Sequence, residues 1–363
     1  MKILQLIDSL EAGGAERMAV NYANALAYET ECSGLVTTRL EGELKNELDP
    51  KVKYIFLNRK STIDYKAVLK LRSFVKKHKF QIIHAHSSSF FISCLLKLIM
   101  PSIKIIWHDH YGNSEFLEQR KETKVLKLFS YMFLGIISVN LILKQWADNC
   151  LNCKRVIYLP NFVLNQQTIE QEKKTFLNGQ QGKRIVCLAN LRLQKNHHFL
   201  LEIAKRLKSI HPDWTFHLIG KNFKDEYAQS IIDKIREYEL SNTVYLYGSC
   251  NDINHILSQA EIGILTSSSE GLPVSILEYG FNKLAVIATN VGEIPNVVLN
   301  NDLGFLVASN DTKSFLDSLN TLILDDSLRQ KLKNNFFKYT MHNFSQSTVI
   351  KKYLNWINNQ YAT

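Results

Sequence analysis

Residues 262–278 read IGILTSSSEGLPVSILE, a short apolar run followed by a polar loop and a second apolar segment. The run at 262–265 predicts a buried strand, and residues 273–281 predict a helix. The same strand–loop–helix order recurs along the chain, with apolar runs at 2–7, 81–85, 104–107, 184–189 and 214–219. Such alternation is typical of parallel β-sheets covered by helices on both faces.

The chain is long enough for two domains of this kind. It has 363 residues, 45% of them hydrophobic, and a polar stretch interrupts the alternation near the middle. We therefore predict a Rossmann-like N-terminal domain at 1–165, a linker at 166–183 and a Rossmann-like C-terminal domain at 184–345. A helix at 346–363 is expected to pack back toward the N-terminal domain. The predicted fold is α/β, with two doubly wound domains facing a central cleft where ligands bind.

Two glutamates with seven residues between them flank the start of the helix in the opening stretch. Glu270 lies in the loop, and Glu278 lies about a turn and a half inside the helix. Gly271 lets a backbone approach a ligand closely, and the N–H groups near Leu272 and Val274 favour an anion. The two acids could therefore accept hydroxyl hydrogen bonds from two parts of one polar ligand, although a capped helix with a solvated glutamate has the same pattern.

This stretch resembles the E-x7-E motif of glycosyltransferase family 4, whose members are retaining enzymes with the GT-B fold. The resemblance implies that Glu270 contacts the hydroxyls of the donor sugar and that Glu278 holds the ribose. It also implies that the diphosphate and sugar are bound with help from the backbone of Gly271, Leu272, Pro273 and Val274. The resemblance extends over nearly the whole chain and is stronger in the second predicted domain.

A basic loop, LANLRLQKNH at 188–197, follows the first strand of the second predicted domain. Arg192 and Lys195 could clamp a diphosphate from two sides and neutralise the charge of a leaving group without a metal. A solvated basic loop is the alternative. Family 4 members usually carry an arginine and a lysine here in the same order, so the resemblance implies that Arg192 and Lys195 bind the diphosphate.

Three other loops match the family in part. Gly13 and Gly14, in LEAGGAER at 10–17, resemble its glycine-rich first loop, which lies near a donor phosphate or the acceptor. Gly220 ends the strand at 214–219, at a turn expected to face the cleft. The segment TNVGEIP at 289–295 departs from the family, because Val291 replaces the first of two glycines. The G-x-G-x-x-G fingerprint of a nicotinamide dehydrogenase is missing.

A histidine-rich segment, IWHDHYG at 106–112, ends a strand of the first predicted domain. In the family a histidine at this place contacts a hydroxyl of the transferred sugar, and His108 and His110 are both candidates. A structural histidine is the alternative. A zinc site made of these two with His84 and His86 is a further reading, but such pairs are common in the family without a metal. We expect no metal, because no D-x-D sequence follows a strand.

The charge of the chain is compatible with two kinds of surface. Its net charge of +10 suits a soluble lysine-rich protein, and equally a protein attracted to phosphates or to an anionic membrane. Residues 66–79 predict a basic amphipathic helix, or else an ordinary covering helix. We find no signal peptide, spanning segment or nucleic-acid-binding signature. We expect a cytoplasmic protein that is soluble or peripheral on the inner face of the membrane.

The family resemblance implies the transfer of a hexose or N-acetylhexosamine from a UDP- or GDP-sugar to a glycan or lipid-linked acceptor. The expected setting is bacterial surface polysaccharide synthesis, with the nucleotide sugar as donor substrate and no further cofactor. Two alternatives remain open. One is a nucleotide-sugar epimerase with the GT-B fold, and the other is a non-catalytic protein that binds sugar nucleotides.

Overall fold

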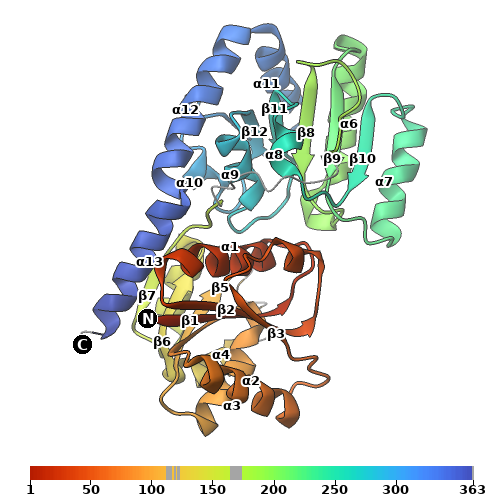
Figure 1. Cartoon of the computed structure of the whole chain (residues 1–363). Coiled ribbons are helices and arrows are strands. Elements are labelled where there is room, and N and C mark those ends of the chain that lie inside the picture. The colour runs from red at the N-terminus through yellow and green to blue at the C-terminus, as the bar shows by residue number, and fades with distance from the viewer. Residues whose placement is uncertain (112–116, 118–119, 121–122, 164–173, 362–363) are drawn as a thin grey trace. The chain divides into compact units, whose positions relative to one another are not determined.

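The computed structural model describes residues 1–111, 117, 120, 123–163 and 174–361 (Figure 1). The chain divides into two compact units, one formed by Met1–Leu164 with Gln346–Thr363 and the other by Asn165–Ser345. Each unit is built around its own parallel β-sheet. The predicted α/β class with two doubly wound, Rossmann-like domains is therefore confirmed.

The first unit contains a seven-stranded sheet in the order β3-β2-β1-β4-β5-β6-β7 within the described residues. Its strands are β1 (Lys2–Ser9), β2 (Cys32–Leu40), β3 (Lys53–Phe56), β4 (Ile82–His86), β5 (Lys104–Asp109), β6 (Phe133–Ser138) and β7 (Val156–Tyr158). Its helices are α1 (Gly14–Glu29), α2 (Tyr65–His78), α3 (Phe90–Ile99), α4 (Thr123–Phe129), α5 (Leu141–Cys150) and α13 (Gln346–Tyr361). Short 3₁₀ turns lie at η1 (Glu43–Glu47), η2 (Ser87–Ser89) and η4 (Ser130–Met132).

Alternate residues of β1 serve two separate hydrophobic clusters. Leu4 and Leu6 belong to the cluster that contains the buried side chains of α2 and α3, whereas Ile7 belongs to the one formed with α1. Successive side chains of a strand point to opposite faces, so this division covers the sheet with helices on both faces. The apolar residues of the strand are consequently buried whichever way they point.

The second unit contains a six-stranded sheet in the order β10-β9-β8-β11-β12-β13 within the described residues. Its strands are β8 (Arg184–Leu188), β9 (Thr215–Ile219), β10 (Val244–Gly248), β11 (Ile262–Leu265), β12 (Ala285–Thr289) and β13 (Phe305–Val307). Its helices are α6 (His197–Ile210), α7 (Glu226–Glu237), α8 (Ile253–Leu257), α9 (Val274–Phe281), α10 (Ile294–Val297), α11 (Thr312–Leu324) and α12 (Asp326–Phe344), and η5 (Leu193–Lys195) is a 3₁₀ turn.

Each sheet reverses its strand order once beside its first strand. In the first unit the chain moves outward from β1 to β2 and β3 and then returns to place β4 on the other side of β1. In the second unit β8 is flanked in the same way by β9 and β11. In an open α/β sheet the loops that follow the two strands at such a reversal diverge and leave room for a ligand. The functional residues are therefore expected after β1 and β4, and after β8 and β11.

Tyr279, a buried residue of α9, connects the two strands at the reversal of the second unit. The pairing of β8 with β11 joins Ile262 to Ile185 and Gly263 to Val186. Beyond these pairs the Tyr279 hydroxyl accepts a hydrogen bond from the backbone N–H of Leu188 at 2.7 Å and donates one to the carbonyl of Ile264 at 3.1 Å. Its ring packs against Gly263, where a Cβ would lie 2.6 Å from ring carbons. The hydroxyl thus replaces the missing strand pairing and holds α9 against both strands.

We predict that Tyr279→Phe destabilises the second unit by about 1–3 kcal/mol, because it leaves a buried N–H and a buried carbonyl without their partner. Thermal and urea unfolding would measure the loss. Tyr245→Phe is the matched control, since that hydroxyl bonds the Asn242 carbonyl at an exposed position and its removal should cost less than about 0.5 kcal/mol. Equal effects of the two substitutions would contradict the bridging role.

Candidate functional site

The loops that follow β8 and β11 are joined directly at the reversal of the second sheet. The backbone N–H of Ser268 donates to the carbonyl of Gln194 at 2.8 Å, and the Thr266 hydroxyl donates to the carbonyl of Lys195 at 3.1 Å. These bonds align the predicted basic loop with the loop that carries Glu270. The two strongest sequence motifs therefore form one site.

Lys195 and Glu270 form the central contact of this site. The Lys195 Nζ lies 2.5 Å from Glu270 Oε1, and the side chains are only 20% and 8% exposed. The Ser267 hydroxyl donates to the same carboxylate oxygen at 2.6 Å. Charges this far from water must be paired and hydrogen-bonded, and their geometry is then tightly constrained. An ammonium has three N–H donors, so Lys195 retains two beyond the one given to Glu270.

Arg192 lies on the exposed side of the same loop and stacks on an aromatic ring. Its guanidinium carbon is 4.7 Å from the centre of the Phe223 ring. The ammonium of Lys221 lies 5.3 Å from the centre of the same ring. The loop after β9 is held there by a hydrogen bond from the Leu191 N–H to the Lys221 carbonyl at 3.0 Å. Cation–π stacking restrains the long arginine side chain while leaving its N–H fork available. Lys221 adds a second cation beside Arg192.

Gly220 is required by close packing of the loops after β8 and β9. A Cβ at this position would lie 2.2 Å from the carbonyl oxygen of Ala189. Its N–H donates to the carbonyl of Gly248 at 2.9 Å. The structure thus gives Gly220 a backbone role, and its predicted contact with the donor stays a prediction.

The start of α9 is supported by the loop after β12. Pro273 is the N-cap of the helix and supplies no side-chain cap. The Glu293 N–H donates to the carbonyl of Gly271 at 3.0 Å. Gly292 has φ of 57°, and a Cβ there would lie 1.9 Å from the carbonyl oxygen of Glu270. Only glycine fits this position, and the 289–295 segment retains it as the second glycine of the family's loop.

The other residues predicted on this segment lie in α9 or just ahead of it. Leu272 is buried, Val274 is half-buried, and α9 begins at Val274. Glu278 is half-buried in the second turn of the helix, and its main-chain carbonyl accepts a hydrogen bond from Asn282. The structure therefore places Glu278 on the same element as the helix start, but outside the Lys195–Glu270 pair.

Gly13 and Gly14 lie after β1, at the reversal of the first sheet. Gly13 is the extended N-cap of α1, and its carbonyl accepts a hydrogen bond from the Arg17 N–H at 2.9 Å. A Cβ on Gly14 would meet no atom within 4 Å. The pair therefore forms the entry to a helix N-terminus, where backbone N–H groups favour anions or hydroxyl oxygens.

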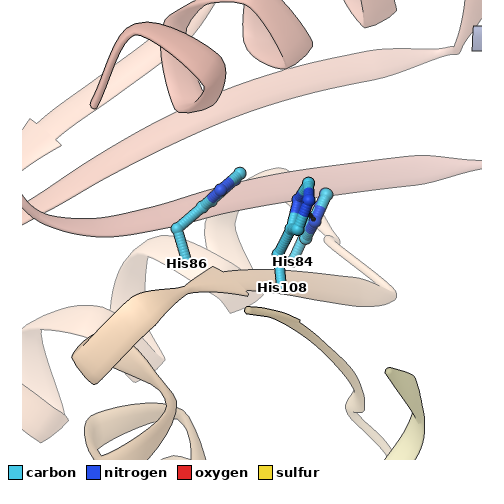
Figure 2. Close-up of side chains that lie close together, drawn as sticks. All are labelled: His84, His86 and His108. Atoms are coloured by element: carbon cyan, nitrogen blue, oxygen red, sulfur yellow. Dashed lines mark hydrogen bonds between the residues drawn. The ribbon is translucent and has the colours of Figure 1, made fainter. Parts of the chain in front are cut away.

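Four histidines gather at the carboxyl ends of β4 and β5. His84 Nε2 lies 3.1 Å from His108 Nδ1, and His86 Nδ1 lies 2.9 Å from His110 Nε2. Figure 2 shows His84, His86 and His108 side by side, all extending from the same side of their strands. The sequence analysis named all four residues, and the structure joins them into two hydrogen-bonded pairs.

The two histidines left open by the sequence differ in their exposure. His108 is completely buried, whereas His110 follows the end of β5 and is only half-buried. Burial lowers the pKa of His84, His86 and His108 well below its usual value and that of His110 to about 3. All four rings are therefore neutral near pH 7. His110 is the member of the pair that a dissolved ligand can reach.

Within the described part of the chain, His84, His86 and His108 form the group that could hold a metal ion, with ligand atoms within 4.8 Å of one another. However, the rings of His84 and His108 lie almost parallel, at 12°, and share a hydrogen bond between their nearest nitrogens. A metal bound by both would have to replace that bond. The two closely spaced cysteines of the first unit, Cys150 and Cys153, both have free thiols. The Cys153 thiol is buried next to the carbonyl of Phe133.

Two family models match adjoining parts of the chain. The model described as glycosyltransferase family 4 matches residues 12–167, and the one described as glycosyl transferases group 1 matches residues 168–339. The chain therefore belongs to the glycosyltransferase family that these two models describe.

Named relatives and a solved structure agree with this assignment. The glycosyltransferase is 25% identical to the UDP-Gal:alpha-D-GlcNAc-diphosphoundecaprenol alpha-1,3-galactosyltransferase of Escherichia coli, over 81% of this chain and 83% of the relative. It is 24% identical, over 98% of both chains, to the GalNAc-alpha-(1->4)-GalNAc-alpha-(1->3)-diNAcBac-PP-undecaprenol alpha-1,4-N-acetyl-D-galactosaminyltransferase of Campylobacter jejuni. The structure of Anabaena HepE in complex with UDP-glucose matches with a TM-score of 0.82 and 17% identity, over 99% of this chain and 100% of that one. At this identity the structural match establishes the fold, which is GT-B.

Sequence reasoning on this glycosyltransferase missed several supporting residues. Ser267 and Phe223 each hold a predicted charged side chain in place, and Tyr279 and Gly292 shape the loops beneath them. The signal for Ser267 was its position three residues before Glu270 in a loop. Phe223 lies three residues after Gly220, but the sequence does not indicate which way the ring of an aromatic loop residue points.

The predicted basic amphipathic helix corresponds to α2, and its apolar side packs inward. Val68, Leu71, Phe74 and Val75 are all buried in the hydrophobic core of the first unit. This packing favours the covering-helix alternative over insertion of the apolar face into a membrane. Among the described residues, the glycosyltransferase has no helix with the length and apolarity needed to cross a bilayer.

The buried histidines predict a fold that is sensitive to acid. Below pH 6.5 the unfolded chain binds protons at His84, His86 and His108, which the folded chain does not, so stability is full above pH 6.5 and falls below it. His110, whose pKa burial lowers to about 3, acts in the same direction, so the four histidines together make the loss of stability steep. Unfolding temperatures measured from pH 7.5 to 5 should fall steeply. His342→Gln, at an exposed position, should leave the slope unchanged, and an unfolding temperature independent of pH would contradict the prediction.

Proposed function

We propose that this glycosyltransferase moves a hexose or N-acetylhexosamine from a UDP-sugar to a glycan or lipid-linked acceptor, with retention of the anomeric configuration. The observation that carries the proposal is the buried Lys195–Glu270 pair at the strand reversal of the second unit. The E. coli relative is named for UDP-Gal, and both reported relatives are named for acceptors linked to undecaprenol. These names support a UDP-sugar and a lipid-linked acceptor, whereas the GDP-sugar of the earlier expectation gains no such support.

The second unit is proposed to hold the donor by electrostatic attraction. Arg192 offers a two-pronged N–H fork to one side of the diphosphate, and Lys195 offers its remaining N–H donors to the other. The second oxygen of Glu270 accepts a hydrogen bond from a sugar hydroxyl, and Glu278 accepts one from the ribose. The backbone of residues 271–274 and the turn at Gly220 approach the phosphates and the sugar. A lysine that is already fixed by Glu270 need not reorganise as charge develops on the leaving group.

The first unit is proposed to hold the acceptor, with the Gly13–Gly14 turn near a donor phosphate or the acceptor. One of His108 and His110 is proposed to contact a hydroxyl of the transferred sugar, and the half-buried His110 is the more accessible of the two. In the reaction the bond from the anomeric carbon to the phosphate oxygen breaks, and a bond to the acceptor oxygen forms on the same face. The hydroxyl proton passes to the departing diphosphate. No protein base and no metal are needed, since Arg192 and Lys195 neutralise the leaving group. An epimerase would return an altered nucleotide sugar with no acceptor, so analysis of the product separates that alternative.

We predict that Lys195→Ala lowers kcat/KM for a UDP-sugar by about 10²–10³-fold, because the cation is lost where leaving-group charge develops. Lys208→Ala is the control, since that ammonium bonds the Glu239 carbonyl at an exposed position. Proton NMR of the wild-type product would give the anomeric configuration in the same assay. Retained activity in Lys195→Ala, or an inverted product, would contradict the proposal.

A second variant separates loss of function from loss of fold. Lys195→Ala leaves the nearly buried carboxylate of Glu270 without its cation, which by itself is destabilising. The double variant Lys195→Ala/Glu270→Gln removes that charge as well. Its unfolding temperature should recover toward the wild-type value while its activity stays lost.

We further propose that the protein acts in the cytoplasm and associates peripherally with the anionic inner face of the membrane. Lysines line the outer side of α2 and its ends, and apolar side chains accompany them: Ile63 and Tyr65 are 72% and 70% exposed, and Leu69 is 39% exposed. The exposed lysines are Lys66, Lys70, Lys76, Lys77 and Lys79. Each basic residue near an anionic surface contributes about 1 kcal/mol of attraction. An undecaprenol-linked acceptor would be presented at such a surface.

Replacing Lys66, Lys76 and Lys77 by Glu is predicted to abolish flotation with vesicles that contain phosphatidylglycerol. The interaction should also weaken at high salt, because exposed charges are screened. A control with the same change in net charge replaces Lys205, Lys313 and Lys331, which are exposed on the second unit. If the control loses flotation equally, net charge and not α2 is responsible.

A further inference from the structure

The buried histidine cluster of the first unit contains two separate hydrogen-bonded chains. In one, His86 Nε2 lies 2.8 Å from Gln5 Oε1, and His86 Nδ1 lies 2.9 Å from His110 Nε2. In the other, the Tyr353 hydroxyl lies 3.1 Å from His84 Nδ1, and His84 Nε2 lies 3.1 Å from His108 Nδ1. The first chain thus runs from β1 through β4 to the half-buried His110, and the second ends at the fully buried His108.

With Oε1 of the Gln5 amide facing His86, the hydrogen bonds of the first chain determine where each proton lies. An amide oxygen only accepts, so the hydrogen bond between Gln5 Oε1 and His86 requires a proton on His86 Nε2. His86 is neutral because burial holds its pKa far below neutral pH, so its Nδ1 has a lone pair. That lone pair accepts from His110 Nε2, which must therefore carry the proton. The remaining nitrogen of the neutral His110 ring, Nδ1, then has a lone pair of its own.

Gln5 is an unusual residue for its position. It is completely buried in β1 between Leu4 and Leu6, and its amide nitrogen has no hydrogen-bond partner among the described residues. Burying an amide with an unpaired donor costs free energy, and an apolar residue at this position would avoid that cost. Within the described residues, the hydrogen bond of its side chain is the one to His86. Any role of the Gln5 side chain in the site must therefore act through its hydrogen bond to His86.

We propose that Gln5 is a positioning residue, which acts through His86 to hold His110 with its proton on Nε2 and a lone pair on Nδ1. His110 then accepts a hydrogen bond from a hydroxyl of the reacting sugars and cannot donate one to a phosphate from Nδ1. The ligand class is a neutral polyol, in contrast to the diphosphate assigned to the second unit. This inference deepens the proposed function and rests on it.

The environment of His110 supports a neutral acceptor. The nearby Asp109 carboxylate is fully engaged by Arg120, whose two terminal nitrogens lie 2.7 and 2.9 Å from its two oxygens. The ring of His108 is 3.9 Å from that of His110 between centroids. The neighbours of His110 are thus the neutral ring of His108 and an ion pair whose charges balance. Its hydrogen bond to His86 also joins two neutral rings.

The decisive comparison is between Gln5→Met, which removes the acceptor for His86, and Tyr353→Phe, which breaks only the second chain in the same buried cluster. Histidine-selective ¹⁵N labelling distinguishes a protonated ring nitrogen from one with a lone pair, and His110→Gln assigns the signals. In the wild type His110 should be protonated at Nε2. Gln5→Met should mix the two tautomers of His110, and Tyr353→Phe should not.

The kinetic readout uses the full chain with a UDP-sugar and its acceptor. Gln5→Met should lower kcat/KM about tenfold, as expected for the loss of one hydrogen bond near 1.4 kcal/mol, while the Kd for UDP and the unfolding temperature of the second unit stay unchanged. Tyr353→Phe should retain wild-type kcat/KM. A loss of activity in Tyr353→Phe but not in Gln5→Met would overturn the proposal and assign the role to His108.

Two further results would overturn the inference independently of activity. One is a wild-type His110 protonated at Nδ1. The other is a stoichiometric zinc ion in the purified protein, since coordination would take the lone pairs that the two chains require. A wild-type enzyme that turns over no UDP-sugar would instead refute the proposed function, and the NMR result would still report on the chain from Gln5 to His110.

Discussion

The candidate site of the second unit depends on one ion pair that is largely shielded from solvent. Lys195 and Glu270 come from loops after neighbouring strands, and neither charge would be stable at its present burial without the other. Such a pair contributes little net stability, because desolvation offsets most of the attraction. What it provides is a fixed geometry, with a cation and a carboxylate held side by side. A nucleotide sugar has complementary groups in the same order, a diphosphate next to a ring of hydroxyls.

The neighbouring backbone is shaped so that this pair can form. The Tyr279 hydroxyl replaces pairing between β8 and β11, which lets the two strands diverge while α9 stays attached to both. Gly292 lets the loop after β12 press against the carbonyl of Glu270, and Gly220 lets the loop after β9 press against Ala189. Each contact involves backbone where a side chain would not fit. The charged residues can therefore be placed precisely enough only because uncharged residues around them are constrained.

The sequence predicted the charged residues better than their supports, for a physical reason. Glu270, Arg192 and Lys195 stand out because charges in loops after apolar strands have few structural roles. Tyr279 lies in an apolar helical segment, where an aromatic residue is expected to belong to the hydrophobic core. Only the structure shows that its hydroxyl bonds the backbones of two strands. The four histidines were visible in the sequence as two closely spaced pairs, 84/86 and 108/110. Spacing reveals neither the hydrogen-bonded partners, which join the two strands, nor which ring stays accessible. For α2, the pattern of lysines and apolar residues was right, while the direction of the apolar side required the packing.

The two units differ in the kind of charge that their candidate sites carry, and this difference suits the chemistry of the groups that we propose they bind. A diphosphate is ionised and gains charge as it leaves, so it needs fixed cations, and the second unit supplies Arg192, Lys195 and Lys221 near the strand reversal. A sugar hydroxyl is neutral and needs directed acceptors, which a cation cannot provide. Burial keeps the histidines of the first unit neutral, so that their lone pairs remain available for hydrogen bonds. The same low-polarity environment that makes these histidines costly at acid pH thus leaves His110 a neutral ring near neutral pH, as its proposed hydrogen bond with a hydroxyl group requires.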